Sequence, residues 1–335
     1  MKNKFLNMVE PEKIAINEET LSLDHIDDEA VAGRTLYTMV STGTEFNGIF
    51  MNALNSKFPR KFGYTAVFQV EKIGKNVAGI EVGDVVFTKA NHQSYQVDNY
   101  KNVIKVPKDI LPEHSLFIRL AGVSMATLNQ THISPGELIL VTGLGPVGFM
   151  AMQIYSNLGY RVIGVDPDEN RRKIASESGF TVFSEVPFEE EIYNKKIALA
   201  LECSGVESAV LDCCNIVRPR GEVSLVGVPW KKHCDIYSQK VLHSIFYNFV
   251  TLYSGWEIDL PRENSKFIYT SENQNYRTAL RFIKERKMNF DGIDGIYVIR
   301  PYTEAQKVFE DIKNKKGTHI FTIFSWNQEV DSDDR

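Results

Sequence analysis

The chain has 335 residues, of which 43% are hydrophobic and 24% are charged, and its formal net charge is −5. This is the composition of a globular protein with enough apolar side chains for two domains or one large one. The acidic balance, without any basic run, argues against nucleic acid as a partner. No segment approaches the roughly twenty apolar residues that a membrane-spanning helix needs, and the first residues lack the apolar core of a signal peptide. We therefore expect a cytoplasmic protein without a membrane partner.

The first part of the chain is predicted to form a β-rich domain. Its strand-like segments are short, contain many β-branched and aromatic residues and are separated by glycines, a pattern typical of antiparallel sheets. The pattern ends near Gly122, so we place this first domain at residues 1–122. The strand-like segments are residues 34–42, 66–74, 83–89 and 94–107.

A strand, a glycine turn, a helix and a second strand are predicted in the middle of the chain. Gly143, Gly145 and Gly148 have the G-x-G-x-x-G spacing of a dinucleotide-binding turn. The first glycine permits the tight turn, the second lets the backbone approach a pyrophosphate, and the third lets the helix lie close to the sheet. Pro146 and Val147 begin the helix, whose free N–H groups face the phosphates. A turn that serves only packing is disfavoured, because apolar runs typical of buried parallel strands flank it on both sides.

Asp166 follows the second strand, about twenty residues after the glycine turn, and is predicted to select the cofactor. A carboxylate there accepts both hydroxyls of the adenosine ribose. A 2′-phosphate would instead meet a like charge, at roughly 4 kcal/mol for unit charges about 4 Å apart at an effective dielectric near 20. We therefore predict NAD as the cofactor. Arg171 could soften this preference by pairing with a phosphate, whereas Arg172 is interpreted as a solvated charge on the next helix.

Strand and helix patterns continue to alternate after the turn, as in a doubly wound parallel sheet, so we predict a Rossmann domain at residues 123–288. Helices are predicted at residues 169–179, 206–221 and 243–248, and strands at 181–185, 197–205, 222–229 and 249–255. Ligands of such sheets bind outside the carboxyl ends of the strands. The residues predicted to line the cofactor at these ends, unless the loops serve only packing, are Cys203, Ser204, Val226 and Val228.

The order of the domains resembles the medium-chain dehydrogenase/reductase superfamily, the zinc alcohol dehydrogenases and their relatives. The resemblance implies a GroES-like catalytic domain, a Rossmann domain, and a return segment at residues 289–335 that completes the catalytic domain and ends in a frayed acidic tail. It also implies that nicotinamide and substrate meet in a cleft between the domains. The segments that carry the resemblance are STGTE at 41–45, FGYTAVFQVEKIG at 62–74, VGD at 82–84, VTGLGPVG at 141–148 and VDPDENRR at 165–172.

Zinc members of this superfamily bind a catalytic ion with a cysteine, a histidine-glutamate pair and a third ligand. Aligned on the shared glycines, this sequence has Thr42 in place of the cysteine, Tyr64 and Thr65 in place of the pair, and Ala121 near the third ligand. None of these supplies the N/S ligands of a catalytic zinc. The four cysteines also lack the C-x-x-C spacing of a structural zinc lobe and are interpreted as buried thiols. We therefore predict that no metal is bound, as in a zinc-independent branch resembling bacteriochlorophyllide dehydrogenase-like and sugar or natural-product oxidoreductases.

Without zinc, a side chain must move the hydroxyl proton during hydride transfer, and such general acid–base catalysis supplies roughly 10² to 10⁴-fold. His92 is the first candidate, in a loop that borders the cleft in this family; the alternative is a surface histidine bonded to backbone. Tyr64 is the second, although its ring could simply fill the volume of the lost metal site. The resemblance gives Thr44 the role of a proton-relaying hydroxyl. Glu45 is interpreted as a base, a substrate anchor or the partner of a buried arginine such as Arg119.

Thr42, Trp230 and Trp256 are predicted on the substrate side, where aromatic faces suit a sugar-like ring, with loop packing as the alternative for the tryptophans. We predict an NAD-dependent, zinc-independent oxidoreductase that interconverts a secondary alcohol and a ketone on a sugar, cyclitol or natural-product intermediate. The alternatives are an enoyl or quinone C=C reductase of the same superfamily and a non-catalytic nicotinamide-sensing protein. The resemblance also implies a homodimer or larger homo-oligomer.

Overall fold

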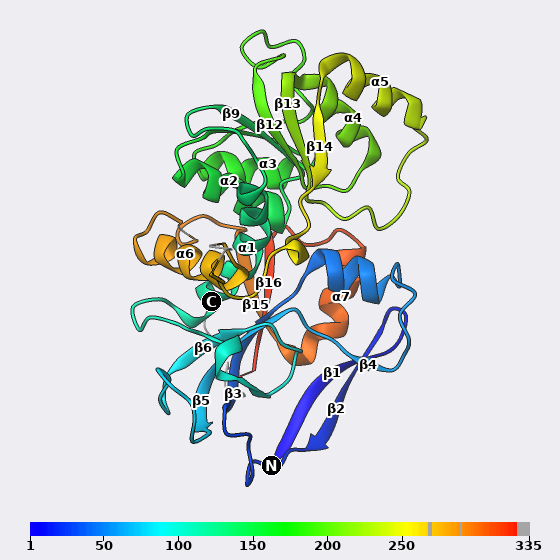
Figure 1. Cartoon of the computed structure of the whole chain (residues 1–335). Helices are drawn as coiled ribbons and strands as arrows, with labels where there is room; N and C mark the ends of the chain where they lie inside the picture. The colour runs from blue at the N-terminus through cyan, green and yellow to red at the C-terminus, as the bar shows by residue number, and fades with distance from the viewer. Residues whose placement is uncertain (267–269, 289, 327–335) are drawn as a thin grey trace. The chain divides into compact units, whose positions relative to one another are not determined.

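The chain folds into two compact units (Figure 1). The first boundary, between Arg119 and Leu120, falls slightly before Gly122, where the sequence suggested it. The return near Asn289 and the frayed tail, both expected from the sequence, fall on residues outside the described part of the chain. The first unit is Met1–Arg119 with Tyr297–Arg335, and the second is Leu120–Ile296. The structure, a computed structural model, describes residues 1–266, 270–288 and 290–326.

An N-terminal hairpin that the sequence analysis missed forms the small sheet of the first unit. It consists of β1 (Lys2–Glu10) and β2 (Lys13–Thr20), and β4 (Arg60–Lys61) pairs with the other edge of β1. Leu6 and Met8 of β1 are completely buried, whereas most of β2 is exposed. The polar residues of β2 hid the period-two pattern on which strand prediction depends.

The larger sheet of the first unit has the strand order β15-β16-β3-β5-β6-β8, and β7 pairs with β3. Most pairs are antiparallel, so the predicted β-rich domain is confirmed; β15 and β16 are parallel and are connected through helix α7 (Ala305–Lys313). Phe309 of α7 packs against Phe50 and Phe62, with ring centroids 5.2 and 5.7 Å apart. The strands are β3 (Ala30–Met39), β5 (Thr65–Ile73), β6 (Val85–Thr88), β7 (Tyr95–Asn99), β8 (Ile104–Lys105), β15 (Tyr297–Pro301) and β16 (Phe321–Ser325).

The second unit is built on a parallel sheet in the order β11-β10-β9-β12-β13-β14. Counted along the chain, this is the 3-2-1-4-5-6 order of a Rossmann fold, so the predicted doubly wound sheet is confirmed. Its strands are β9 (Leu138–Thr142), β10 (Arg161–Val165), β11 (Thr181–Phe183), β12 (Ile197–Glu202), β13 (Val217–Leu225) and β14 (Thr251–Ser254).

Helices connect these strands, and within the described residues none is long and apolar enough to span a membrane. The α-helices before α7 are α1 (Ile118–Ala126), α2 (Pro146–Asn157), α3 (Glu169–Glu177), α4 (Glu207–Ile216), α5 (Ser238–Asn248) and α6 (Glu272–Lys284). Thr42–Phe50 is a π-type helix, and single 3₁₀ turns lie at Tyr100–Asn102, Pro112–Phe117, Thr127–Asn129, Glu257–Asp259 and Tyr302–Glu304.

The predicted helix at residues 206–221 is wrong in its second part. Helix α4 ends at Ile216, and the chain enters β13 at Val217. Pro219 explains the difference, because proline has no N–H for a helix and restricts the residue before it. Arg220 then has φ = 62°, which a helix does not permit.

Candidate functional site

The glycine turn joins β9 to α2 at the carboxyl edge of the parallel sheet. Gly143 has φ = 81°, a conformation that favours glycine, and its N–H donates to the carbonyl oxygen of Val165 at 2.8 Å. A Cβ at Gly143 would lie 2.8 Å from the backbone nitrogen of Ser204, so the turn packs tightly against the loop after β12. A Cβ at Gly148 would lie 1.9 Å from the carbonyl oxygen of Gly143. The helix therefore approaches the turn as closely as the sequence predicted.

Gly145 differs from the other two glycines because the space beside it is open. Within 4 Å, a Cβ there would meet only the guanidinium of Arg171, 3.7 Å from Nη1. Gly145 is the N-cap of α2, and no side chain caps the N–H groups of the first turn, where Pro146 and Val147 lie. Uncapped N–H groups at a helix N-terminus attract anions, so this turn has room and charge for a pyrophosphate.

Asp166 follows β10 and holds the glycine turn from the side. Its Oδ2 accepts a hydrogen bond from the N–H of Leu144 at 2.7 Å, and its Oδ1 accepts one from the N–H of Asp168 at 2.8 Å. Arg171 Nη1 lies 3.3 Å from Oδ2, and this arginine side chain is 46% exposed whereas Asp166 is buried. The carboxylate thus lies under Arg171, next to the turn where the adenosine ribose binds in Rossmann folds.

Arg172 has a structural contact instead of the free, solvated position expected from the sequence. Its Nη1 donates to the carbonyl oxygens of Asp166 and Pro167 at 2.8 and 2.7 Å. The two neighbouring arginines therefore differ in role, because Arg172 fixes the chain after β10 while Arg171 reaches over the turn.

Glu202, which the sequence analysis did not select, is a completely buried carboxylate at the end of β12. It accepts hydrogen bonds from the N–H of Ser204 at 2.7 Å, from the N–H of Gly205 at 3.0 Å and from the Ser204 hydroxyl. Its main-chain carbonyl accepts from the N–H of Gly227 at 2.7 Å. Burial raises the pKa of Glu202, and the hydrogen bonds from Ser204 and Gly205 oppose that shift. The sequence signal was a carboxylate at the end of the apolar run IALALE.

The predicted cofactor-lining residues Cys203, Ser204, Val226 and Val228 lie after the neighbouring strands β12 and β13. The two loops touch, because a Cβ at Gly205 would lie 2.4 Å from the carbonyl oxygen of Val228. Val226 is buried, and Val228 is 45% exposed. Burial raises the pKa of the Cys203 thiol well above its usual range, so the thiol stays protonated at neutral pH. Contact of these residues with a cofactor stays a prediction.

The carboxyl edge of β9, β10 and β12 has the groups that a dinucleotide requires. The first turn of α2 would hold the pyrophosphate, Gly145 leaves room for it, and Asp166 and Arg171 lie where the adenosine ribose binds in this fold. This edge is the candidate cofactor site of the second unit.

In the first unit, the π-type helix Thr42–Phe50 carries several of the predicted catalytic residues. The Ser41 hydroxyl caps it by accepting from the N–H of Thr44 at 3.1 Å. Thr42 and Thr44 are half-buried at its start. Helices of this type are rare and often occur at functional sites.

Glu45 of this helix forms a pair with His92, and both side chains are completely buried. Glu45 Oε1 lies 2.8 Å from His92 Nε2, the distance of an ion pair, although the N–H is not aligned with the oxygen as a hydrogen bond requires. Glu45 Oε2 accepts from the N–H of Ser41 at 2.7 Å. On the other side of the imidazole, Thr38 Oγ1 lies 2.7 Å from His92 Nδ1 and accepts from Trp326 Nε1 at 2.9 Å.

The expectation of His92 in a loop at the edge of a cleft is corrected, because the side chain lies inside the first unit. Its ring packs edge-on against Phe62 and Phe324, with centroids 5.4 and 5.2 Å away. Gly63 makes this burial possible, since a Cβ there would lie 2.3 Å from the backbone nitrogen of His92. In this position His92 holds Glu45 and Thr38, and it has no exposed surface of its own.

The expected partner of Glu45, Arg119, is corrected as well, because the structure pairs Glu45 with His92. Arg119 instead lies over the ring of Tyr64, with its guanidinium carbon 4.4 Å from the ring centroid. Tyr64 itself is half-buried. The neighbouring Thr65 is buried, and its hydroxyl donates to the carbonyl oxygen of Thr88 at 3.1 Å. Tyr64 is therefore the more accessible of the two residues in place of the histidine-glutamate pair.

The predicted substrate residues belong to both units. Thr42 is in the first unit and is half-buried, with its carbonyl oxygen accepting from Asn47 Nδ2 at 3.0 Å. Trp230 is half-buried and Trp256 is 61% exposed, and both belong to the second unit. Their role toward a substrate stays a prediction. Across the described residues, no group of three or more His, Cys, Asp or Glu side chains has an arrangement that could hold a metal ion.

The Rossmann unit with its glycine turn, together with a β-rich unit completed by the C-terminal segment, defines a two-domain dehydrogenase fold. A family model described as "Zinc-binding dehydrogenase" matches residues 146–263. L-threonine 3-dehydrogenase from Pyrococcus abyssi is 25% identical over 308 residues, covering 80% of this chain and 83% of that one. Acryloyl-coenzyme A reductase from Sulfurisphaera tokodaii is 28% identical over 168 residues, covering 40% and 50%.

The fold has a close counterpart among solved structures. Galactitol-1-phosphate dehydrogenase from Escherichia coli matches with a TM-score of 0.79 at 18% sequence identity, over 96% of this chain and 99% of that one. These similarities relate the chain, in sequence and in fold, to dehydrogenases of the alcohol dehydrogenase type.

Proposed function

We propose that this protein is a zinc-independent, NAD-dependent oxidoreductase that interconverts a secondary alcohol and a ketone on a polar small molecule. The observation that carries the cofactor choice is the Asp166 carboxylate, which accepts from the N–H of Leu144 in the glycine turn at 2.7 Å. A 2′-phosphate bound next to this turn would lie close to a fixed negative charge. Arg171 acts in the opposite direction, but its 3.3 Å contact with Asp166 means that part of its charge is already neutralised.

The residue types in place of zinc ligands support a metal-independent reaction. Thr42, Tyr64 and Thr65 provide hydroxyl groups where a catalytic zinc needs thiolate or imidazole. The part of the chain matched by the zinc-binding dehydrogenase model begins at residue 146, after all of these positions. The match therefore concerns the nucleotide-binding part and leaves the proposed loss of zinc open to a direct test.

Bound NAD supplies the hydride acceptor for the alcohol, so the chain must supply the group that takes the hydroxyl proton. We assign this role to Tyr64, with Thr44 as the relaying hydroxyl, because both are half-buried. Glu45 and His92 are completely buried, so we assign them a positioning role. Glu45 accepts from the N–H of Ser41, and the Ser41 hydroxyl caps the helix that carries Thr44. Trp230, Trp256 and Thr42 remain the proposed substrate contacts.

A metal analysis and a cofactor titration of the purified protein test the proposal. We expect less than stoichiometric zinc, and tighter binding of NADH than of NADPH. Stoichiometric zinc or a clear preference for NADPH would contradict it. A substrate screen should include L-threonine and galactitol 1-phosphate, the compounds in the names of its relatives. The activity found in this screen is then measured for the Tyr64→Phe variant. We expect kcat to fall about 10² to 10⁴-fold in this variant, whereas a tyrosine that only fills space would leave kcat unchanged.

The similarity to acryloyl-coenzyme A reductase favours a second candidate, reduction of an activated C=C bond. It covers only 40% of this chain, so it supports the alternative less than the longer match to threonine dehydrogenase supports the first proposal. Oxidation of NADH or NADPH in the presence of acryloyl-coenzyme A would identify this activity. Tight NADH binding without hydride transfer to any compound of the screen would instead indicate a nicotinamide-sensing protein.

We further propose that the chain forms a homodimer through the edge of its parallel sheet. Strand β14 is an edge strand, and helix α5, which precedes it, exposes Leu242, Phe246 and Tyr247 at 64%, 74% and 66%. Exposed apolar side chains that gather on one element are typical of protein interfaces. Light scattering should show a dimer, and Phe246→Asp should yield monomers. The matched control Ile192→Asp, at an exposed residue outside α5 and β14, should leave the dimer intact.

A further inference from the structure

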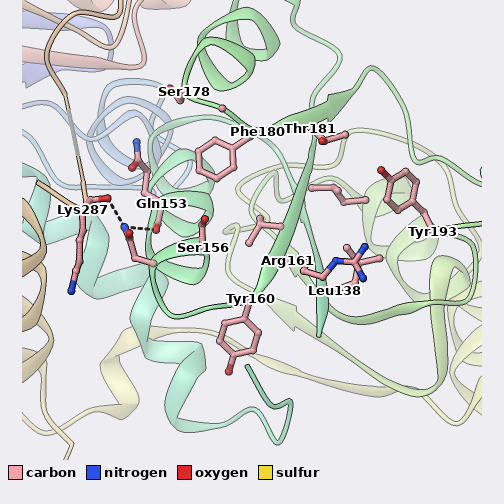
Figure 2. Close-up of a pocket in the computed structure, with 14 residues that line it drawn as sticks. Leu138, Gln153, Ser156, Tyr160, Arg161, Ser178, Phe180, Thr181, Tyr193 and Lys287 are labelled. Carbon is pink, nitrogen blue, oxygen red and sulfur yellow. Dashed lines mark hydrogen bonds between the residues drawn. The ribbon is translucent and has the colours of Figure 1, made fainter. Parts of the chain in front are cut away.

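The second unit has a cavity of about 450 Å³ at the amino ends of its parallel strands, where the first residues of β9, β10 and β11 line it (Figure 2). Asn157 on its wall already donates to the carbonyl oxygens of Gln153 and Lys287, at 2.9 and 2.6 Å. Part of the wall is therefore bonded within the chain, and we assign no ligand to this cavity.

In the first unit, four side chains form a buried row that begins at Trp326 and ends at Glu45. Strand β16 pairs antiparallel with β3 so that Phe324 lies opposite Thr38, and Trp326 follows two residues later on the same face. Its indole Nε1 donates to Thr38 Oγ1 at 2.9 Å, and Thr38 Oγ1 lies 2.7 Å from His92 Nδ1. His92 Nε2 lies 2.8 Å from Glu45 Oε1. Because Trp326 is 5% exposed and the other three are completely buried, bulk water does not reach this row.

The indole fixes the direction of the hydrogen bonds at its end of the row. A tryptophan Nε1–H can only donate, so Thr38 Oγ1 is the acceptor in its contact with Trp326. The hydrogen of the Thr38 hydroxyl then needs an acceptor of its own, because a buried hydroxyl without one is costly. Among the residues that the structure describes, the other partner of this hydroxyl is His92 Nδ1. His92 Nδ1 is therefore the acceptor and carries no proton.

The carboxylate at the other end leads to the same assignment. If His92 Nε2 carried no proton, its lone pair would face a carboxylate oxygen 2.8 Å away, and two acceptors at that distance repel each other. A proton on Nε2 instead places the positive end of the N–H near Glu45 Oε1, although the two are not aligned as a full hydrogen bond requires. A carboxylic acid at Glu45 could donate to Nε2, but the imidazole proton would then be on Nδ1 and the Thr38 hydroxyl would lack an acceptor.

We propose that Trp326 is a positioning residue that, through Thr38, fixes His92 as the tautomer with its proton on Nε2. This tautomer presents a donor to Glu45, so Glu45 stays a carboxylate and remains the acceptor for the N–H of Ser41. Ser41 in turn caps the π-type helix. That this helix is catalytic rests on the proposed function. The same assignment removes His92 as a catalytic base, because neither of its ring nitrogens is free to take a proton from a substrate.

Solid-state NMR of the full chain with ¹⁵N-labelled histidine tests the tautomer directly, because protonated and unprotonated ring nitrogens differ in chemical shift. The chain has seven histidines, and the signal of His92 is the one left after the other six have been replaced one at a time. We expect a single His92 species with its proton on Nε2. A proton on Nδ1, or on both nitrogens, overturns the inference and leaves the proposed cofactor and the proposed loss of zinc unaffected.

Two substitutions show which end of the row fixes the tautomer. In Glu45→Gln the amide can donate or accept, so only Trp326, through Thr38, still determines the direction. We expect His92 to keep its proton on Nε2 in this variant. In the double variant Glu45→Gln/Trp326→Phe neither end fixes the direction, and a second His92 signal with the proton on Nδ1 should appear. A Nδ1 proton in Glu45→Gln alone, or no second signal in the double variant, would show that Trp326 does not set the tautomer.

Kinetics of Trp326→Phe and Tyr302→Phe separate positioning from packing. Tyr302 stacks on Trp326 with ring centroids 4.3 Å apart and makes no hydrogen bond through its hydroxyl among the described residues, so Tyr302→Phe is the matched control. With a substrate from the screen, Trp326→Phe should lower kcat about threefold to tenfold, the effect of one hydrogen bond, and leave KM and NADH affinity unchanged. The control should leave all three unchanged. Wild-type kcat in Trp326→Phe, or an equal fall in both variants, contradicts the positioning role. If no compound in the screen reacts, the proposed function fails, and the NMR result still decides the tautomer.

Discussion

Arg171 Nη1 lies 3.3 Å from Asp166 Oδ2, so the guanidinium covers the carboxylate that we propose selects the cofactor. The two side chains favour different cofactors. The carboxylate disfavours the 2′-phosphate that distinguishes NADP from NAD, whereas the guanidinium would pair with it. The preference for NAD or NADP therefore depends on both side chains, and one substitution at each position can separate their effects.

We expect Asp166→Asn to reduce the preference for NADH over NADPH by about tenfold or more, equivalent to about 1.4 kcal/mol. Asparagine keeps one oxygen, which can still accept from the N–H of Leu144 in the glycine turn, although the N–H of Asp168 loses its acceptor. Arg171→Ala should change the preference in the opposite direction. Fluorescence titration with both reduced cofactors measures the ratio without a known substrate. An unchanged ratio in both variants would show that this pair does not select the cofactor.

Gly145→Ala and Gly148→Ala should have different effects. Gly145 has φ = −69°, which alanine adopts easily, and the space beside it is open apart from Arg171. Alanine at Gly145 should leave the melting temperature unchanged and weaken NADH binding about tenfold or more, because the methyl group occupies the approach of the pyrophosphate. Alanine at Gly148 should lower the melting temperature as well, since its Cβ would lie 1.9 Å from a carbonyl oxygen. Equal melting temperatures for the two variants would contradict this difference.

Glu202→Gln should alter both the pH dependence of stability and cofactor binding. Burial raises the pKa of Glu202 in the folded protein above the unfolded value of 4.5, so the folded state keeps this proton at pH values where the unfolded chain has lost it. This contribution to stability is complete below about pH 4.5 and is lost as the pH rises through the folded pKa.

In Glu202→Gln this pH-dependent component is absent, so the melting temperature should fall less steeply above pH 4.5 than in the wild type. The amide offers one acceptor to the N–H groups of Ser204 and Gly205, and a lost charge-assisted hydrogen bond costs about 1.5 to 3 kcal/mol. Because the loop with Ser204 packs against Gly143 of the glycine turn, loss of this hydrogen bond should also weaken NADH binding by about tenfold or more. Glu185→Gln, at an exposed glutamate, is the control. The same slope in both variants would rule out Glu202 as the titrating group.

Glu45 and His92 should prove energetically coupled. Glu45→Leu or His92→Phe alone leaves one member of a buried pair without its partner, which typically costs about 3 to 5 kcal/mol. The double variant replaces the pair with apolar side chains and should recover much of that loss. Urea unfolding followed by tryptophan fluorescence provides the double-mutant cycle, and Trp326, which contributes to that signal, bonds to Thr38 of the same network. Additive losses would show that the 2.8 Å contact contributes no coupling.

Features that depend on local spacing could be predicted from the sequence. Gly143, Gly145 and Gly148 are close in the chain, and their spacing alone fixes how a turn meets a helix and a sheet. The apolar strands of the parallel sheet were equally visible, because strands buried on both faces have continuous apolar runs.

Features that depend on distant parts of the chain could not be predicted. The burial of His92 requires the close passage of Gly63, and its partner Glu45 is far away in the sequence. Glu202 was overlooked for a similar reason, because a carboxylate at the end of an apolar strand shows no role until its hydrogen-bond donors are known. Sequence spacing selected the candidate residues, whereas long-range packing decides which of them are accessible.

The N-terminal hairpin has a practical consequence for anyone who produces this protein. The N–H of Leu6 in β1 donates to the carbonyl oxygen of His92 at 2.9 Å, and the N–H of Ser94 donates to the carbonyl oxygen of Lys4 at 2.8 Å. A protein that lacks the first few residues, or a purification tag that displaces β1 from its sheet, would remove these two backbone hydrogen bonds next to His92. Low activity in such a sample would come from the altered N-terminus, because every proposed catalytic side chain would still be present.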